Sequence, residues 1–160
     1  MGRSVWTHGP TAGPVPARVR RRRISEQIEL LRRAPLFAGL SKTNLRVIAD
    51  VSSARRFSSG DVLVKQGAAG AVLYVIVEGE AKVVRNRRVL KTFGPGDLFG
   101  EMSVLTGAPR SASVVAETEM ECLTLSGREL RRVLEVHPAM AQKMLVDIAG
   151  RLEEADKLIS

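Results

Sequence analysis

Residues 94 to 116 bring a carboxylate, a guanidinium and several glycines close together in this 160-residue chain. Glu101 supplies the carboxylate, and Arg110, nine residues later, supplies the guanidinium. Gly100 and Gly107 flank the segment between them, so backbone N–H groups can be approached closely there. A guanidinium fork matches the paired oxygens of a phosphate, and a carboxylate can accept hydrogen bonds from a ribose hydroxyl. The stretch therefore predicts a site for a phosphate and the sugar attached to it.

Local structure is expected to position these groups. A strand ending at Phe99 should turn into a short helix over about residues 101 to 105, and the free N–H groups of a helix start attract anions. The turn at residues 107 to 109 then returns the chain and delivers Arg110. Ser111 can add a hydroxyl hydrogen bond and Ala112 an amide hydrogen bond.

The same residues have a simpler interpretation, an ion pair between Glu101 and Arg110 within a loop. No Ser, Cys or His in the stretch has a plausible base partner in sequence, so the pattern predicts binding without a reaction, and no enzyme. The glycines at positions 94, 96 and 100 lack the spacing of a dinucleotide fingerprint, and no P-loop sequence is present.

The composition is typical of one soluble globular domain, with 44% hydrophobic and 26% charged residues. No apolar run approaches the roughly 20 residues of a membrane span, and no signal peptide is recognisable. The single cysteine, Cys122, cannot form an internal disulfide, and two histidines add too few ligands for a metal site. We therefore expect a cytoplasmic protein with no transmembrane segment and no metal.

The net charge of +8 is concentrated at the N-terminus. Residues 1 to 34 carry eight arginines and two glutamates, whereas the remaining 126 residues carry 17 basic and 15 acidic groups. Residues 1 to 23 are predicted to form a disordered, Arg-rich leader. The run Arg18–Arg23 is interpreted as a solvated arm or helix start, and contact with anionic lipid or nucleic acid is the alternative.

The remaining residues, 24 to 160, are expected to form one domain of mainly β structure. Ser25 should cap a first helix that Pro35 ends, and Ser41 should start a second. From Ala54 onward, short apolar runs alternate with glycine turns every 8 to 12 residues. Seven or eight such strands predict an antiparallel sandwich or jelly roll. The corners that allow positive φ are expected at Gly60, Gly67, Gly79 and Gly96.

Two helices should follow the last strand. Ser126 and Glu129 predict a capping box for the first, which His137-Pro138 ends. A second, long helix is expected over residues 139 to 160. Its apolar residues are spaced 4, 3, 4, 3, 4, which is the repeat of a coiled-coil seam. They are Ala141, Leu145, Ile148, Leu152, Ala155 and Ile159. This pattern favours a homodimer through the helix, and packing on its own domain is the alternative.

Two segments of the central stretch resemble the phosphate-binding cassette of cyclic nucleotide-binding domains. They read Phe99-Gly100-Glu101-Met102-Ser103-Val104-Leu105 and Pro109-Arg110-Ser111-Ala112-Ser113-Val114. The four corner glycines and the run Tyr74–Glu80 resemble the β-roll of the same family. The resemblance covers about residues 35 to 160.

The resemblance implies an eight-stranded antiparallel β-roll with flanking helices that binds cAMP (or cGMP) as a regulatory ligand. Glu101 would hold the ribose 2′-hydroxyl and Arg110 the cyclic phosphate, and the C-terminal helix would close over the base. Val83, Leu90 and Phe93 would line the apolar side of the pocket. The complete set of ligand-binding residues is then Gly100, Glu101, Met102, Arg110, Ser111, Ala112, Val83, Leu90 and Phe93.

The long helix resembles the dimerisation helix of Crp/Fnr-type regulators. Those regulators continue into a helix-turn-helix, and no such DNA-binding motif occurs in these 160 residues. Where the cAMP-binding regulators place a Thr-Ser pair against adenine, this chain has Ala155 and Asp156. The domain is also similar to that of bacterial cyclic-nucleotide-gated potassium channels.

The prediction is therefore a non-enzymatic sensor module that binds cAMP, with cGMP as the alternative ligand, couples binding to movement of its C-terminal helix, and acts on an unidentified downstream protein. Three alternatives stay open. The chain could be the sensor half of a Crp/Fnr-type regulator, a regulatory fragment of a channel or transporter, or a β-roll interaction module that binds no nucleotide.

Overall fold

The computed structural model describes residues 23 to 159, so the predicted leader falls almost entirely outside the described residues. The helices are α2 (Ile24–Arg33), α3 (Lys42–Val51), α4 (Glu101–Thr106), α5 (Gly127–Val136) and α6 (Pro138–Ile159). The strands are β1 (Ser53–Phe57), β2 (Val62–Val64), β3 (Val72–Glu78), β4 (Ala81–Arg85), β5 (Arg88–Phe93), β6 (Leu98–Phe99), β7 (Ser113–Ala116) and β8 (Met120–Ser126).

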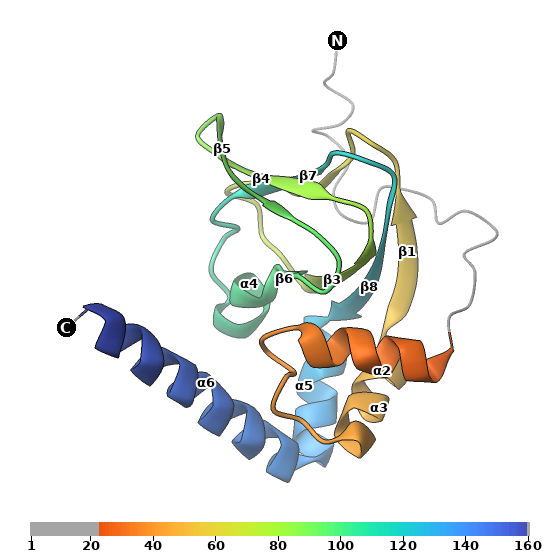
Figure 1. Cartoon of the computed structure of the whole chain (residues 1–160), viewed down its shortest axis with the longest axis vertical. Helices are drawn as coiled ribbons and strands as arrows, with labels where there is room; N and C mark the ends of the chain where they lie inside the picture. Colours follow the sequence, from red (N-terminus) through yellow and green to blue (C-terminus); the bar gives the residue numbers. More distant parts are fainter. Residues whose placement is uncertain (1–22, 160) are drawn as a thin grey trace.

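The eight strands form two four-stranded antiparallel sheets, in the orders β1-β8-β3-β6 and β2-β7-β4-β5. Together they make a β-roll, with α2, α3 and α5 gathered at one end and α4 beside β6 (Figure 1). The predicted fold class, an eight-stranded antiparallel β-roll with N-terminal helices and a long C-terminal helix, is confirmed.

Glycines form the corners of the roll. Gly60, Gly67, Gly79 and Gly96 have φ values of 93°, 83°, 92° and 88°, as their spacing predicted. This left-handed region is costly for residues with a side chain but open to glycine. The β4–β5 hairpin instead turns on Asn86 and Arg87, both with positive φ, which is the geometry of a tight hairpin turn.

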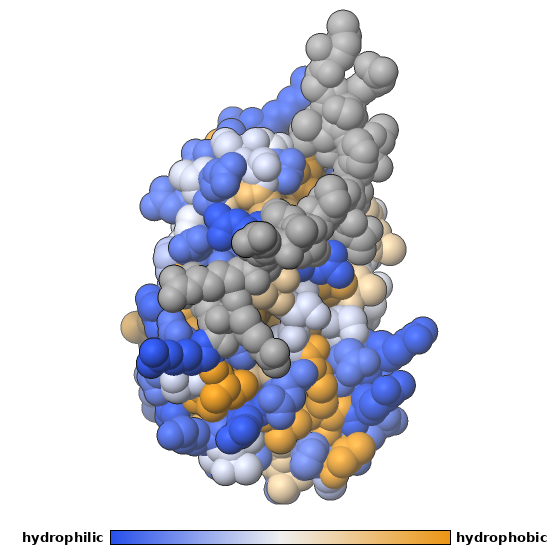
Figure 2. All heavy atoms as spheres, turned by 90° about the vertical axis from the view of Figure 1, so that its right-hand side faces the viewer, coloured by the Kyte–Doolittle hydropathy of each residue, from blue (hydrophilic) through white to orange (hydrophobic). Residues whose placement is uncertain are grey.

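Two apolar clusters stabilise the domain. One fills the space between the helices and the outer face of the β1-β8-β3-β6 sheet, with Phe37, Leu45 and Ile48 fully buried in it. The other fills the inside of the roll, around Tyr74 and Ile76. On the face that carries α2 and β1, apolar side chains lie among hydrophilic ones toward the helical end (Figure 2).

The helix caps agree with the sequence in two of three cases. Ser41 accepts a hydrogen bond from the Asn44 N–H at 3.2 Å, and Ser126 accepts one from the Glu129 N–H at 3.0 Å, which is the serine half of the predicted capping box. The prediction that Ser25 caps the first helix is wrong, because α2 already begins at Ile24. The Glu26 carboxylate accepts from the Arg23 N–H at 3.3 Å, which makes Arg23 the N-cap residue.

Helix α6 changes character along its length. It begins at Pro138, one residue before the predicted start, since proline fits the first helical position. Met140 and Met144 are buried against the helical core, whereas every side chain described from residue 149 onward is exposed. Within residues 23 to 159, no helix is both long and apolar enough to cross a membrane.

Candidate ligand-binding site

A cavity of about 590 Å³ opens between the β4–β5 hairpin and the segment that runs from β6 through α4 to β7. All nine residues predicted to bind ligand line this cavity. Gly100, Glu101, Met102, Arg110, Ser111 and Ala112 come from the central stretch, and Val83, Leu90 and Phe93 come from the hairpin. The roll therefore brings together two sets of residues that are separate in sequence.

Arg110 lies at the closed end of the cavity, with only 4% of its surface exposed. Its Nη1 donates to the Gly100 carbonyl at 2.8 Å and its Nη2 to the Val72 carbonyl at 2.7 Å. Burial lowers the pKa of the guanidinium, while nearby Tyr74 and Glu101 act in the opposite direction. Two fixed carbonyls therefore orient a buried cation that still has further N–H donors.

Glu101 is the first residue of α4 and is half-buried at the cavity wall. Gly100, the N-cap residue, has φ of 87°, so the chain turns sharply from β6 into the helix. Among the described residues no ion pair joins Glu101 to Arg110, and the ion-pair alternative is not what the structure shows. The carboxylate and the guanidinium thus line the same cavity separately, which suits a ligand with one group for each.

A row of stacked aromatic rings borders the cavity. Phe93 stacks on Phe99 with 5.6 Å between ring centroids, and Phe99 stacks on Tyr74 at 4.8 Å. Burial raises the pKa of the Tyr74 phenol, which stays neutral and donates to the Leu63 carbonyl. These rings form a continuous apolar floor between the inside of the roll and the cavity.

Sequence reasoning missed two basic residues of the cavity, Arg85 and Lys91. Arg85 follows Val83 by two positions on β4, so strand alternation alone could have placed it on the same face. Lys91 pairs with Val83, but the register shifts between Val83 and Val84, and this irregularity brings both Leu90 and Lys91 to the cavity. Such a shift leaves no signal in the sequence.

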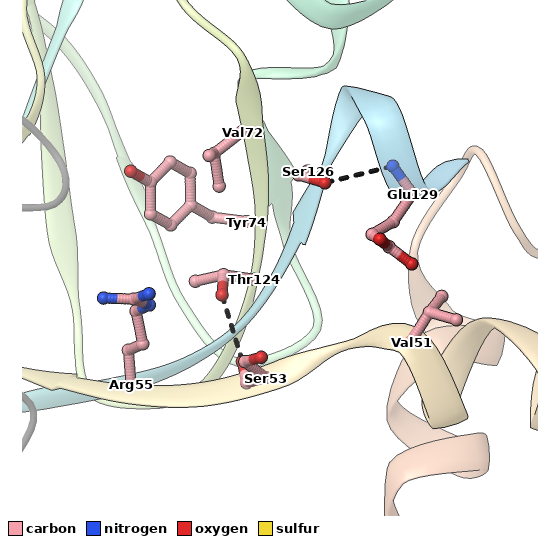
Figure 3. Close-up of a pocket in the computed structure, with 8 residues that line it drawn as sticks. All are labelled: Val51, Ser53, Arg55, Val72, Tyr74, Thr124, Ser126 and Glu129. Atoms are coloured by element: carbon pink, nitrogen blue, oxygen red, sulfur yellow. Dashed lines mark hydrogen bonds between the residues drawn. The ribbon is translucent and has the colours of Figure 1, made fainter. Parts of the chain in front are cut away.

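A second, smaller cavity of about 140 Å³ lies between β1, β3, β8 and the start of α5 (Figure 3). The Thr124 hydroxyl there donates to the Ser53 carbonyl, and the Ser126 hydroxyl accepts from the Glu129 N–H. Val72 lines this cavity while its carbonyl accepts from Arg110. The small cavity therefore adjoins the strand that holds Arg110, but it is much smaller than the first.

The described residues contain no group of three or more His, Cys, Asp or Glu side chains placed to hold a metal ion. Cys122 is buried, and burial raises the pKa of its thiol, so the thiolate that reactions require is disfavoured. The fold and the site together define a small-ligand-binding β-roll whose cavity pairs a buried guanidinium with a carboxylate.

A sequence model described as "cyclic nucleotide-binding domain" matches residues 54 to 137. The chain belongs to this family. It is 34% identical over 128 residues to a cyclic AMP receptor protein of Thermus thermophilus, covering 77% of this chain and 59% of that protein. It is also 34% identical over 113 residues to a cGMP-dependent protein kinase of Toxoplasma gondii, covering 71% of this chain and 11% of the kinase.

A solved structure agrees with this assignment. The N-terminal domain of a transcriptional regulator from Streptomyces coelicolor superposes with a TM-score of 0.74 at 34% identity, covering 82% of this chain and 94% of that domain. The chain spans less than two thirds of either full-length relative. This chain therefore shares its family and its domain fold with these proteins. The similarity does not assign to it the activities of the longer proteins.

Proposed function

We propose that this domain is a sensor that binds a purine 3′,5′-cyclic nucleotide, cAMP in preference to cGMP, without catalysing a reaction on it. The buried guanidinium of Arg110 carries the proposal. It faces the cavity, two carbonyls orient it, and no carboxylate of the described residues pairs with it. A buried cation of this kind favours an anion strongly, because little water screens the attraction.

The other cavity residues suit the rest of such a ligand. Glu101 can accept from the ribose 2′-hydroxyl, whereas direct contact with the phosphate would bring like charges together. Ser111 and the amides near Gly100, Met102 and Ala112 can donate to phosphate oxygens. Val83, Leu90 and Phe93 offer apolar surface to the sugar and base.

The preference for cAMP rests on the resemblance and on a relative. A threonine directly after the arginine would favour cGMP, but this chain has Ser111, which is compatible with either purine. The Thermus thermophilus relative is a cyclic AMP receptor protein. A cytoplasmic location and an unidentified downstream protein belong to the same proposal.

Isothermal titration of the protein with cAMP, cGMP and linear 5′-AMP tests the binding. We expect saturable binding of both cyclic nucleotides, tighter for cAMP, and much weaker binding of 5′-AMP, whose dianionic phosphate has a different shape and position. If neither cyclic nucleotide gives heat or a thermal shift at millimolar concentration, the sensor proposal is wrong. Tighter binding of cGMP would overturn only the cAMP preference.

We further propose that α6 carries the output, by pairing with a second copy and by shifting position when ligand binds. Leu145 and Leu152 are 67% and 66% exposed, and Ala155 is exposed as well, so three of the six predicted seam residues are available for pairing. Ala141 is half-buried, Ile148 packs partly on the domain's own core, and the side chain of Ile159 lies outside the described residues.

Sedimentation equilibrium of a Leu145→Glu, Leu152→Glu variant tests the pairing. We expect a dimer for the wild type and a monomer for the variant, because two carboxylates would face their copies across the seam. Glu154→Lys changes the opposite side of the helix from Leu145 and serves as the control that stays dimeric. The same mass for the wild type and the double variant would contradict the pairing.

A further inference from the structure

The β2–β3 loop holds the backbone of Arg110 although residues 65 to 71 do not line the cavity. The Gly67 N–H donates to the Arg110 carbonyl at 2.8 Å, and the Arg110 N–H donates to the Ala68 carbonyl at 2.8 Å. Two reciprocal bonds therefore fix the position from which the arginine side chain starts.

The same loop also contacts the head of the side chain, at Gly70. A Cβ atom added to Gly70 would overlap Nε and Cζ of Arg110 and lie 2.6 Å from Nη2. All three of its nearest atoms belong to Arg110. A Cβ added to Gly100 would likewise lie 2.9 Å from Nη1. Both glycines thus present bare backbone to the guanidinium.

The two glycines differ in why they need to be glycine. Gly100 has φ of 87°, so a side chain there would strain the backbone whatever surrounds it. Gly70 does not have a positive φ, and its backbone can accept alanine. The steric reason for glycine at position 70 is therefore the guanidinium of Arg110.

We infer that Gly70 is a positioning residue for the arginine of the ligand site. The guanidinium packs against the backbone of Gly70, which has no side chain, while the Gly100 and Val72 carbonyls accept its hydrogen bonds. We call this contact surface the seat. A methyl group at position 70 would push the flexible end of Arg110 away from both carbonyls and turn the fork from its direction in the cavity. The role toward a phosphate rests on the proposed function, whereas the seat itself is a contact within the free protein.

Thermal unfolding of the ligand-free protein tests the seat through a double-mutant cycle. Gly70→Ala should lower the Tm when Arg110 is present, because the arginine loses its carbonyl partners. With Arg110→Ala the added methyl has room, and Gly70→Ala should leave the Tm unchanged or raise it, since alanine restricts the unfolded chain.

Gly150→Ala is the matched control, because nothing lies within 4 Å of the added carbon and the position is remote from Arg110 in sequence. It should change the Tm equally in all backgrounds. An equal Tm loss from Gly70→Ala with and without the arginine head would overturn the inference, since the methyl would then be colliding with something other than Arg110.

Titration with cAMP and cGMP tests the positioning role. Gly70→Ala should weaken both by about 10- to 100-fold, the range expected when charge-assisted hydrogen bonds are misdirected. An unchanged Kd in a variant that has lost thermal stability would overturn the positioning role. A wild type that binds neither nucleotide would overturn the proposed function together with the phosphate role of the seat, and the unfolding cycle would still decide whether Gly70 supports Arg110.

Discussion

At one end of the cavity Arg110 is 4% exposed and held by two carbonyls, whereas at the other end, on the β4–β5 hairpin, Leu90 is 49% exposed. The first end is lined by the residues around Gly100 at the start of α4 and by Arg110, Ser111 and Ala112, and the Val72 carbonyl of β3 holds the guanidinium there. The second end is formed by the β4–β5 hairpin, where β5 is the edge strand of its sheet.

The two ends differ in how far their side chains are fixed before a ligand binds. Groups that are fixed before binding lose little conformational entropy when the ligand arrives, so they contribute strongly to affinity. Under the proposed function, the buried end would bind the anion and the hydroxyl-bearing sugar. The exposed end offers apolar surface, and none of its described polar side chains is fixed by several hydrogen bonds. It should therefore discriminate less between bases.

The largest effect is expected at Arg110. Arg110→Lys keeps the positive charge but loses the planar fork and the bonds to the Gly100 and Val72 carbonyls. We expect cAMP to bind about 100-fold more weakly, which corresponds to the loss of about 3 kcal/mol of charge-assisted hydrogen bonding. Isothermal titration gives the Kd, and circular dichroism checks that the variant is folded. A loss of less than threefold would show that this end of the cavity is not the phosphate end.

A smaller effect is expected at Glu101, because Glu101→Gln keeps an oxygen acceptor and loses only its charge. We expect about tenfold weaker binding of cAMP. The matched test uses 2′-deoxy-cAMP, which lacks the hydroxyl that Glu101 would hold. Wild type and variant should bind the deoxy ligand with the same Kd. If the substitution weakens both ligands equally, Glu101 does not contact the 2′-hydroxyl.

The smallest effect is expected at the exposed end. Leu90→Ala removes apolar surface that is already about half exposed to solvent, so we expect about fivefold weaker binding for cAMP and cGMP alike. The ratio of the two Kd values, measured by titration, should stay within about twofold of the wild-type ratio. A change in that ratio larger than the loss in affinity would show that the hairpin distinguishes adenine from guanine. The exposed end would then contribute to base specificity, contrary to the expectation.

Features that depend on local conformation could be predicted from the amino-acid sequence. Glycine spacing predicted four corners with positive φ, because only residues without a side chain adopt that conformation freely. The cassette residues could be named because a carboxylate, an arginine and glycines lie within a few residues of one another. The prediction that Ser25 caps the first helix was wrong, because the Glu26 carboxylate accepts from the Arg23 N–H and the helix begins at Ile24, before Ser25.

Features that depend on contacts between distant segments became visible only in the folded chain. It brought the hairpin residues Val83, Leu90 and Phe93 to the cassette, and a register shift added Lys91 to the same wall. It placed Gly70, forty residues before Arg110, directly against the guanidinium. Nothing local marks a glycine as the seat of a remote side chain, because the reason for it is the steric contact between two segments that only folding brings together.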